Sequence, residues 1–578
     1  MSMKNPLKKI SAVFYSLRDF LWGYPRFVIR SFKSLRKYIV FIITLGLGFY
    51  FTIVFTNQFD KTFISSNKVL NEAYILSTDE SSALTINPLI TTNSQLEKDL
   101  TALIYLPLFK IDQDGKLTYK LAKGYTVSED CKSYTFILRD DVWWHNLGNN
   151  DYEKFDADDV VYTFTKSQKA KDLNISVRKD SEYKVVFTIP QESPLLLEQI
   201  TTGILPEHVW SKVDDGKFQF YFRNKAPIGT GPYKLISMDD NQIILERNEQ
   251  YFGDKPKLQE IHIHFFSDIQ STITEIKRGK IDSILNPPEE IKDIFEEEYT
   301  EYQRYSKTIY RNTKVIFLNM REQIRYDDET DNVLSNTDIR QALSMYINRN
   351  ELLSTLHIEG DTAIGPINKT SWAFDENINY YDYNPDSASK SLMAIGYKLD
   401  DNSGYWKQND KTLSLTVTFL DNKSNNLLVK ALQEQYKSHG IELVADPKPY
   451  DSLTNEILPL RNFQMLIFEI ETGLDPDCFN WFDSNATEHP MLNLSGYSNT
   501  QTDRRLITAR TTIDRKERKE MYSEALDYLM YDMPVIYLYH PEINYYVKKK
   551  ITNIDLSLIT IAQERFDTVS KWDMKQYD

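Results

Sequence analysis

The chain has 578 residues, more than one hydrophobic core can organise, so we expect at least two lobes. Its hydrophobic fraction of 41% and charged fraction of 26% are those of an ordinary folded protein. A net charge of −15 argues against nucleic acid as a partner, because phosphates demand clustered cations on the protein.

The N-terminal segment departs from this acidic character. Residues 1–37 carry nine Lys or Arg against the single acid Asp19, a charge of +8 that leaves −23 for the rest. Residues 38–56, YIVFIITLGLGFYFTIVFT, follow without a charge, and a helix of that length nearly crosses a hydrocarbon core of about 30 Å. The basic flank predicts a transmembrane helix with residues 1–37 in the cytoplasm, a linker at 57–68 and the acidic body outside.

Two alternatives compete with this transmembrane helix at residues 38–56. A buried core helix is disfavoured by the Lys and Arg that crowd one flank. A cleaved signal peptide is the stronger rival, but the apolar run is long and no small-x-small cleavage site or Cys follows it. We therefore expect the anchor to be retained, in a single-pass protein of the cell membrane.

After the linker, strand-like and helix-like segments alternate, which is an α/β pattern. Apolar-rich runs predict strands at 74–76, 134–138, 184–189, 242–246, 260–265, 314–318, 413–419 and 465–470. Capping residues predict helix starts after Asp156, Asn336 and Asp514, and Pro385 with Gly396 frames a further helix.

The sequence offers little catalytic chemistry. It has no G-x-S-x-G, H-E-x-x-H or phosphate-binding glycine motif, and its eight His include one pair, His262 and His264, for which no third metal ligand is signalled. Cys131 and Cys478 are the only cysteines, and a bridge between them requires that they meet in space. We expect no metal or cofactor, and we expect that the protein is not an enzyme.

Read in order, several motifs carry a family resemblance. They are INPLI at 86–90, DQDGKLTYKLAKGYTVSEDCKSYTFILRDDVWWHN at 112–146, KFDADDVVYTF at 154–164, PIGTGPYKL at 227–235, KRGKID at 277–282, NTDIRQALSMYINRNELL at 336–353, LDPDCFNWFDS at 474–484 and DMPVIYLY at 532–539. In the GTGPY turn, glycine permits a positive φ at no steric cost. The succession resembles the family 5 extracellular solute-binding proteins, the oligopeptide and dipeptide receptors of ABC transporters.

This resemblance implies a two-lobed, periplasmic-binding-protein-like fold of the hinge-closing type II, behind the transmembrane helix. Lobe I would span residues 69–313, with 537–578 returning to it, and lobe II would span 314–536. The segments that cross between the lobes are expected near 312–318 and 533–539. Ligands of such proteins lie between the lobes, where an extended peptide pairs its backbone with strand edges.

Candidate ligand-binding residues follow from the same resemblance. Thr91, Thr92, Asn93 and Ser94 correspond to a lobe I stretch whose backbone runs along the peptide in relatives. Peptide receptors place an Asp before a "DP" pair to hold the ligand's ammonium, whereas this chain has EIETGLDPD at 469–477.

Three further candidates lie in or just after the EIETGLDPD segment. Thr472 stands at the likely Asp position and Glu471 one residue before it. Glu471 would replace the Asp from one residue away, and along a strand a shift of one residue reverses the face. The open readings are that Glu469 or Glu471 faces the cleft, or that both are solvated loop charges. Trp481 is the nearest candidate for an aromatic platform.

The function expected from these observations is extracytoplasmic binding of peptides or similar oligomeric solutes, with delivery to an ABC transporter permease. The alternative is a membrane-anchored sensor or adaptor that uses the same ligand trap without transport. The basic cytoplasmic segment favours the alternative, because a simple receptor needs no cytoplasmic arm.

Overall fold

The computed structural model describes residues 68–76, 84–90, 94–112, 115–145, 153–322 and 332–575. Residues from Lys68 onward group into one compact unit of mixed α/β structure. No helix among these described residues combines the length and apolar character that a membrane span requires. The predicted transmembrane helix at 38–56 lies outside the described residues.

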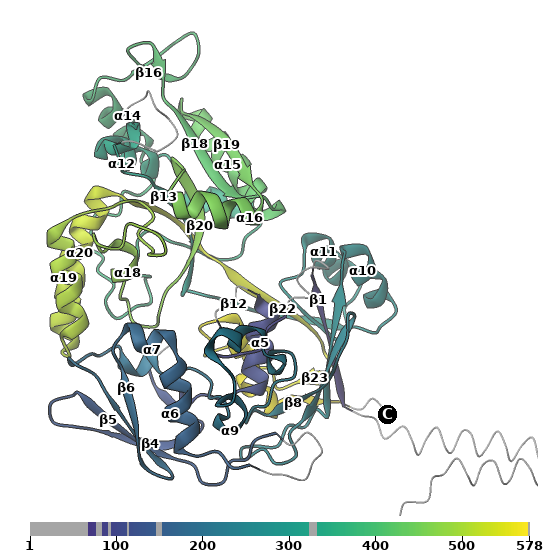
Figure 1. The fold of residues 1–578 in the computed structure, drawn as a ribbon. Helices are drawn as coiled ribbons and strands as arrows, with labels where there is room; N and C mark the ends of the chain where they lie inside the picture. Colours follow the sequence, from purple (N-terminus) through teal and green to yellow (C-terminus); the bar gives the residue numbers. More distant parts are fainter. Residues whose placement is uncertain are drawn as a thin grey trace, which may run out of the picture. The chain divides into compact units, whose positions relative to one another are not determined.

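A seven-stranded sheet contains the first and the last long strands of this unit (Figure 1). Its strand order is β12-β22-β11-β1-β10-β9-β8, in which β1 runs parallel to β10 and β11. The strands are β1 (Val69–Ile75), β8 (Tyr233–Met238), β9 (Gln242–Arg247), β10 (Glu260–Phe266), β11 (Ser283–Leu285), β12 (Tyr302–Thr308) and β22 (Glu542–Lys548).

A six-stranded sheet of order β14-β21-β13-β20-β18-β19 forms a second framework. Its strands are β13 (Asn312–Leu318), β14 (Asp361–Thr362), β18 (Ser414–Leu420), β19 (Glu442–Lys448), β20 (Met465–Glu471) and β21 (Val535–His540). A four-stranded sheet of order β4-β5-β7-β6 comprises β4 (Ala122–Val127), β5 (Ser133–Leu138), β6 (Ser176–Ser181) and β7 (Lys184–Thr188). The eight strands predicted from apolar runs all form, with ends shifted by a few residues.

The helices begin where the capping residues predicted. Asp156 and Asp159 form a capping box at the start of α6, Asn336 caps α12, and Asp514 accepts hydrogen bonds from the first turn of α20. The longer helices are α5 (Gln95–Ile104), α6 (Ala157–Lys166), α10 (Ile269–Lys277), α11 (Glu289–Glu297), α12 (Thr337–Met345), α13 (Arg349–Thr355), α14 (Pro385–Ala394), α15 (Lys423–Ser438), α19 (Thr500–Thr511), α20 (Arg515–Asp532) and the 3-10 helix η5 (Ala562–Lys571).

Shorter elements complete the unit. The helical ones are α7 (Gln168–Asp172), α8 (Leu196–Gln199), α9 (Glu207–Trp210), η1 (Asp215–Phe220), η2 (Phe222–Asn224), η3 (Val333–Ser335), α16 (Tyr450–Ser452), η4 (Leu453–Ile457), α17 (Leu458–Leu460) and α18 (Phe479–Phe482). The extended ones are β2 (Phe109–Ile111), β3 (Leu117–Tyr119), β15 (Lys398–Leu399), β16 (Trp406–Gln408), β17 (Lys411–Thr412), β23 (Ile551–Thr552) and β24 (Asp573–Met574).

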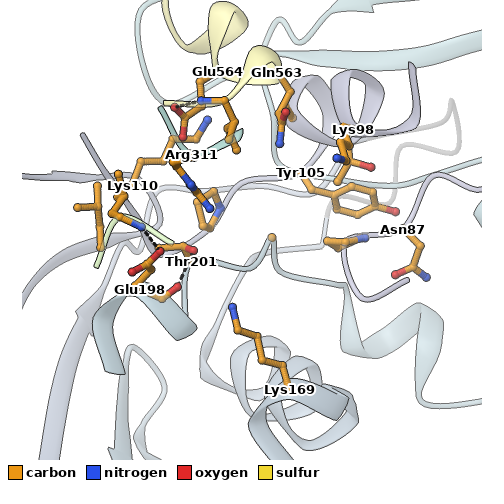
Figure 2. A pocket seen from close by; sticks show the side chains of 18 of the residues that line it. Asn87, Lys98, Tyr105, Lys110, Lys169, Glu198, Thr201, Arg311, Gln563 and Glu564 are labelled. Carbon is orange, nitrogen blue, oxygen red and sulfur yellow. Dashed lines mark hydrogen bonds between the residues drawn. The ribbon is translucent and has the colours of Figure 1, made fainter. Parts of the chain in front are cut away.

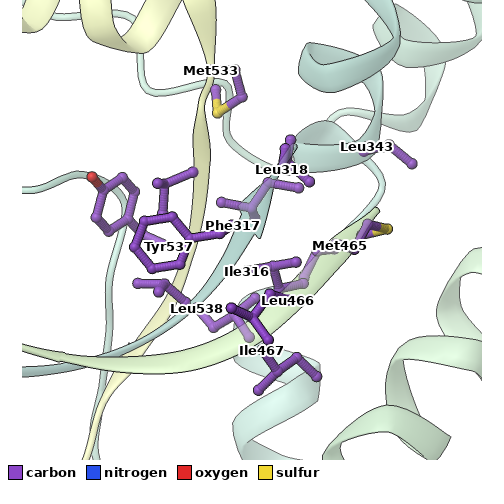
Figure 3. Close-up of a cluster of buried hydrophobic side chains, with 14 of the residues drawn as sticks. Ile316, Phe317, Leu318, Leu343, Met465, Leu466, Ile467, Met533, Tyr537 and Leu538 are labelled. Atoms are coloured by element: carbon purple, nitrogen blue, oxygen red, sulfur yellow. The ribbon is translucent and has the colours of Figure 1, made fainter. Parts of the chain in front are cut away.

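Each large sheet has its own hydrophobic core. In the six-stranded sheet, strand β13 lies between β20 and β21, and its residues Val315, Ile316, Phe317 and Leu318 are fully buried (Figure 3). A strand flanked by neighbours and covered on both faces favours such a continuous apolar run. A separate cluster packs around β1, β9 and β10 of the seven-stranded sheet.

The chain passes between the two large sheets at two points, residues 309–311 and Pro541. The two passages are hydrogen-bonded to each other, because the Ile309 N–H donates to the Pro541 carbonyl at 2.9 Å. These positions lie beside, not within, the ranges suggested from sequence, which form β13 and β21 themselves. The division into lobes stays a prediction.

The GTGPY turn needs its glycines for a reason other than the expected one. Neither Gly229 nor Gly231 has a positive φ. A Cβ on Gly229 would lie 1.9 Å from the carbonyl oxygen of Ile104, and one on Gly231 would lie 2.3 Å from that of Leu103. Glycine is required here because the turn packs directly on the backbone at the end of helix α5.

Candidate functional site

A cavity of 380 Å³ opens where helix α5 and the INPLI turn approach the loop that follows strand β20 (Figure 2). Its volume is near the lower end of the range of about 300–1,000 Å³ that is typical of small-molecule sites. The lining residues are Asn87, Pro88, Ile90, Lys98, Thr101, Ala102, Tyr105, Pro107, Lys110, Ile111, Lys169, Glu198, Thr201, Gly203, Arg311, Leu474, Ile561, Gln563 and Glu564.

The INPLI turn is held in place by its asparagine. The Asn87 side-chain oxygen accepts a hydrogen bond from the Leu89 N–H at 2.9 Å, and its amide nitrogen donates to the Asn224 side chain at 2.9 Å. Asn87 is buried, so both bonds are shielded from water. The motif therefore fixes one wall of the cavity through a local turn and one long-range contact.

Helix α5 supplies a second wall. Ser94 caps its N-terminus by accepting from the Glu97 N–H, and Lys98 and Thr101 reach the cavity one and two turns further on. Beneath this wall, the fully buried Arg565 of η5 donates to both carboxylate oxygens of Asp99 on α5 at 2.7 Å. The ion pair fixes the helix from its far side.

Glu198, which follows the four-stranded sheet, reaches the loop after β20. Its carboxylate accepts hydrogen bonds from the backbone N–H groups of Leu474 at 2.6 Å and Asp475 at 3.0 Å. A Cβ on Gly473 would lie 2.5 Å from the Glu198 carboxylate, so glycine permits this approach. The contact joins the two sides of the cavity.

Arg311 lies in the first passage between the two large sheets. Its Nε donates to the Thr472 carbonyl at 2.7 Å, and its guanidinium lies 3.8 Å from the Glu471 carboxylate. Lys98 approaches the same carboxylate at 3.5 Å. Glu471 thus has two cationic neighbours.

The residues predicted for the ligand site lie in different parts of the structure. Thr91, Thr92 and Asn93 lie outside the described residues, whereas Ser94 is the helix cap. Glu471 ends strand β20, and Thr472 donates from its backbone N–H and its hydroxyl to the Arg311 carbonyl at 2.8 and 3.2 Å.

Trp481 belongs to a different environment, because it packs against the core of the six-stranded sheet with its ring centroid 6.0 Å from that of Phe317. It is not among the cavity-lining residues. The ligand-binding roles of all these residues stay predictions.

Asp475, in the same loop as Thr472, has a structural partner. It accepts a hydrogen bond from Arg518 at 2.7 Å and one from the Tyr522 hydroxyl at 3.0 Å, and both partners lie on helix α20. Arg518 is buried, so the ion pair is shielded from solvent. Asp475 ties the LDPD loop to that helix.

Four charged residues that no sequence motif selected also line the cavity: Lys98, Lys169, Glu198 and Arg311. Each is a common charged residue outside any recognisable motif. Glu198 and Leu474 are 276 residues apart, and such a contact leaves no local pattern.

Neither cysteine nor histidine builds a second site in the described part of the chain. Cys131 and Cys478 are both free thiols, so the bridge that the sequence left open does not form. His262 contacts Glu260 at 2.6 Å, and His264 contacts Asn71 at 3.0 Å. No group of three or more His, Cys, Asp or Glu suited to a metal ion occurs within the described ranges.

Comparison with solved structures defines the class of fold. The oligopeptide-binding protein AppA from Bacillus subtilis, solved in complex with a nonapeptide, matches with a TM-score of 0.71 at 21% identity, over 88% of this chain and 99% of that one. NikZ from Campylobacter jejuni, solved with Ni(L-His), matches with a TM-score of 0.71 at 24% identity and the same coverage. The fold is that of the periplasmic binding proteins.

Sequence comparison gives the family. Residues 116–489 match the model of the bacterial extracellular solute-binding proteins, family 5 (middle region). Oligopeptide-binding protein AppA of Bacillus subtilis (strain 168) is 24% identical over 462 residues, covering 77% of this chain and 82% of that protein. The chain therefore belongs to family 5 of the extracellular solute-binding proteins, and it is a binding protein with an extracytoplasmic main body, not an enzyme.

Proposed function

We propose that this protein captures a peptide or a similar oligomeric solute in the cavity and delivers it to an ABC transporter permease. The observation that carries the proposal is the composition of the cavity wall, which draws on α5, the INPLI turn, Glu198 and the loop after β20. Relatives named as oligopeptide-binding and dipeptide-binding proteins support a peptide as the solute.

Ligand capture in this proposal is a hinge motion between two lobes. Lobe I carries the seven-stranded and four-stranded sheets, and lobe II carries the six-stranded sheet. Only residues 309–311 and Pro541 would need to change their backbone angles, since these are the two passages between the large sheets. Ligand binding energy would then shift the population toward the closed form.

The proposed location is the outer face of a cell membrane. The uncharged run at 38–56 would anchor the chain, with residues 1–37 in the cytoplasm. Protease added to intact cells should then digest the body from Lys68 onward while leaving the basic segment intact. Protection of the body, or a mature N-terminus just beyond Thr56, would show that the anchor is wrong.

Two measurements test solute capture itself. Mass spectrometry of small molecules released from the purified protein should identify peptides, and small-angle scattering of ligand-stripped protein should show compaction when the released molecules are added back. Scattering that stays unchanged at saturating ligand would rule out closure. Release of a non-peptide solute alone would overturn the peptide assignment.

A further inference from the structure

The acidic groups on the cavity wall already have hydrogen-bond donors. Glu198 accepts from the Leu474 and Asp475 N–H groups. Glu564 accepts from the Thr560 N–H at 2.6 Å and from its hydroxyl at 2.9 Å. Neither carboxylate needs a ligand ammonium to compensate its burial.

The cations of the wall are less completely matched. Lys110 is paired with Asp567, Arg311 donates to the Thr472 carbonyl, and Lys98 contacts the half-exposed Glu471. Lys169 differs from these three, because its amine has no hydrogen bond or ion pair with any residue that the structure describes. Figure 2 shows its side chain pointing into the cavity from helix α7.

The surroundings of Lys169 favour an anion. Lys169 is an exposed residue, yet the protein that crowds its side chain lowers the pKa of its amine; Glu198 and Glu471 raise this pKa and Arg311 lowers it. An anionic ligand group beside the amine would stabilise its charged form. A ligand ammonium would add a further like charge.

We propose that the ligand of this protein presents a carboxylate to the cavity, and that Lys169 binds this carboxylate with Lys98 and Arg311 as neighbouring cations. For a peptide, that group is the C-terminal carboxylate or an acidic side chain. The proposal rests on the proposed function and specifies its ligand class. The cavity would then recognise a negative ligand group, whereas the sequence predicted that Glu471 binds a positive one. Glu471 already has Lys98 and Arg311 as cationic partners.

Tripeptide mixtures with defined ends provide the test. The purified full-length protein, stripped of ligand, is dialysed against three mixtures of equal side-chain composition: free at both ends, N-acetylated with a free carboxylate, and C-amidated with a free ammonium. Mass spectrometry reports the bound fraction of each. We expect the N-acetylated acids to be retained and the amides to bind at least about tenfold more weakly, since hydrogen bonds to charged groups contribute about 1.5–3 kcal/mol.

Variants of α7 connect this preference to Lys169. Lys169→Met should weaken binding of the N-acetylated acids about tenfold, with the amides almost unchanged, and Lys169→Arg should restore most of the affinity. Lys171→Met is the matched control, because Lys171 lies on the same short helix but does not line the cavity. Thermal unfolding of each variant checks that the fold is retained.

The outcomes separate this inference from the proposed function. Retention of the amides but not the acids, or full acid binding by Lys169→Met, overturns the carboxylate site and leaves peptide binding intact. Failure of all three mixtures to bind overturns peptide capture, and the inference falls with it.

Discussion

The carboxylate of Glu198 accepts a 2.6 Å hydrogen bond from the backbone N–H of Leu474, which connects the segment after the four-stranded sheet with the loop after strand β20. Because this bond and its companion to the Asp475 N–H cross the cavity, they stabilise the arrangement in which both walls are close together.

Removing this carboxylate should favour the open form. Glu198→Ala is expected to increase the radius of gyration of the ligand-free protein and to weaken ligand binding about tenfold, since charge-assisted hydrogen bonds contribute about 1.5–3 kcal/mol. Scattering and calorimetry with the co-purified ligand measure the two effects. Glu129→Ala, in an exposed turn away from the cavity, serves as the control. Identical scattering from Glu198→Ala and the unsubstituted protein would contradict the role of Glu198 in closure.

The buried ion pair behind α5 makes a prediction about stability. Arg565 contacts Asp99 and Glu72, and all three side chains are fully buried. Arg565→Met leaves two carboxylates without a cation, and breaking such a pair from one side costs about 3–5 kcal/mol. The midpoint of urea unfolding should fall accordingly. Arg505→Met removes a surface pair with Glu524 and should cost less than about 1 kcal/mol. Similar midpoints for the two variants would be the contrary result.

The burial of His145 predicts that the fold becomes less stable as the pH falls. The Gly229 N–H donates to Nδ1 of His145, and Nε2 of the same ring lies 2.9 Å from the Gly231 carbonyl oxygen. This arrangement suits the neutral ring. Burial lowers the pKa of His145 from 6.5 to about 4. Between those values the unfolded chain binds one more proton than the folded one, so acidification favours unfolding.

The size of this effect follows from the shift in pKa. A difference of roughly 2.5 units corresponds to about 3 kcal/mol of unfolding free energy lost as the pH falls from 6.5 to 4. Urea denaturation across that range should show a shallower loss for His145→Gln, since glutamine keeps one donor and one acceptor without titrating. Parallel stability curves for both proteins would disprove a buried neutral histidine.

The close approach at the GTGPY turn gives a steric prediction. Gly229→Ala would place a methyl group 1.9 Å from the Ile104 carbonyl oxygen, and the required backbone shift should cost about 1–3 kcal/mol or more. Gly216→Ala is the control, because a Cβ there has no neighbour within 4 Å. Thermal unfolding should separate the two, and an unchanged midpoint for Gly229→Ala would mean that the turn does not pack on α5 as described.

Local patterns allowed the sequence to predict much of the framework. Asp156, Asn336 and Asp514 indicated helix starts, because a capping side chain accepts hydrogen bonds from N–H groups only two or three residues away. Apolar runs such as 314–318 marked strands for a similar reason, since burial of successive side chains follows the period of the strand. The ordered succession of motifs was enough to recognise the family, which the comparisons confirm.

The sequence by itself therefore determined eight of the strands, several helix starts, the family and the class of function, all of which depend on neighbouring residues or on the order of motifs. Only the tertiary structure decided that Glu198 meets the Leu474 N–H and that Lys98 and Arg311 lie beside Glu471. It also decided that the Lys169 amine lines the cavity without a partner among the described residues. These contacts join segments up to hundreds of residues apart. Their charges interact because the fold brings them within a few ångströms, and Coulomb energy depends on that distance and not on separation along the chain.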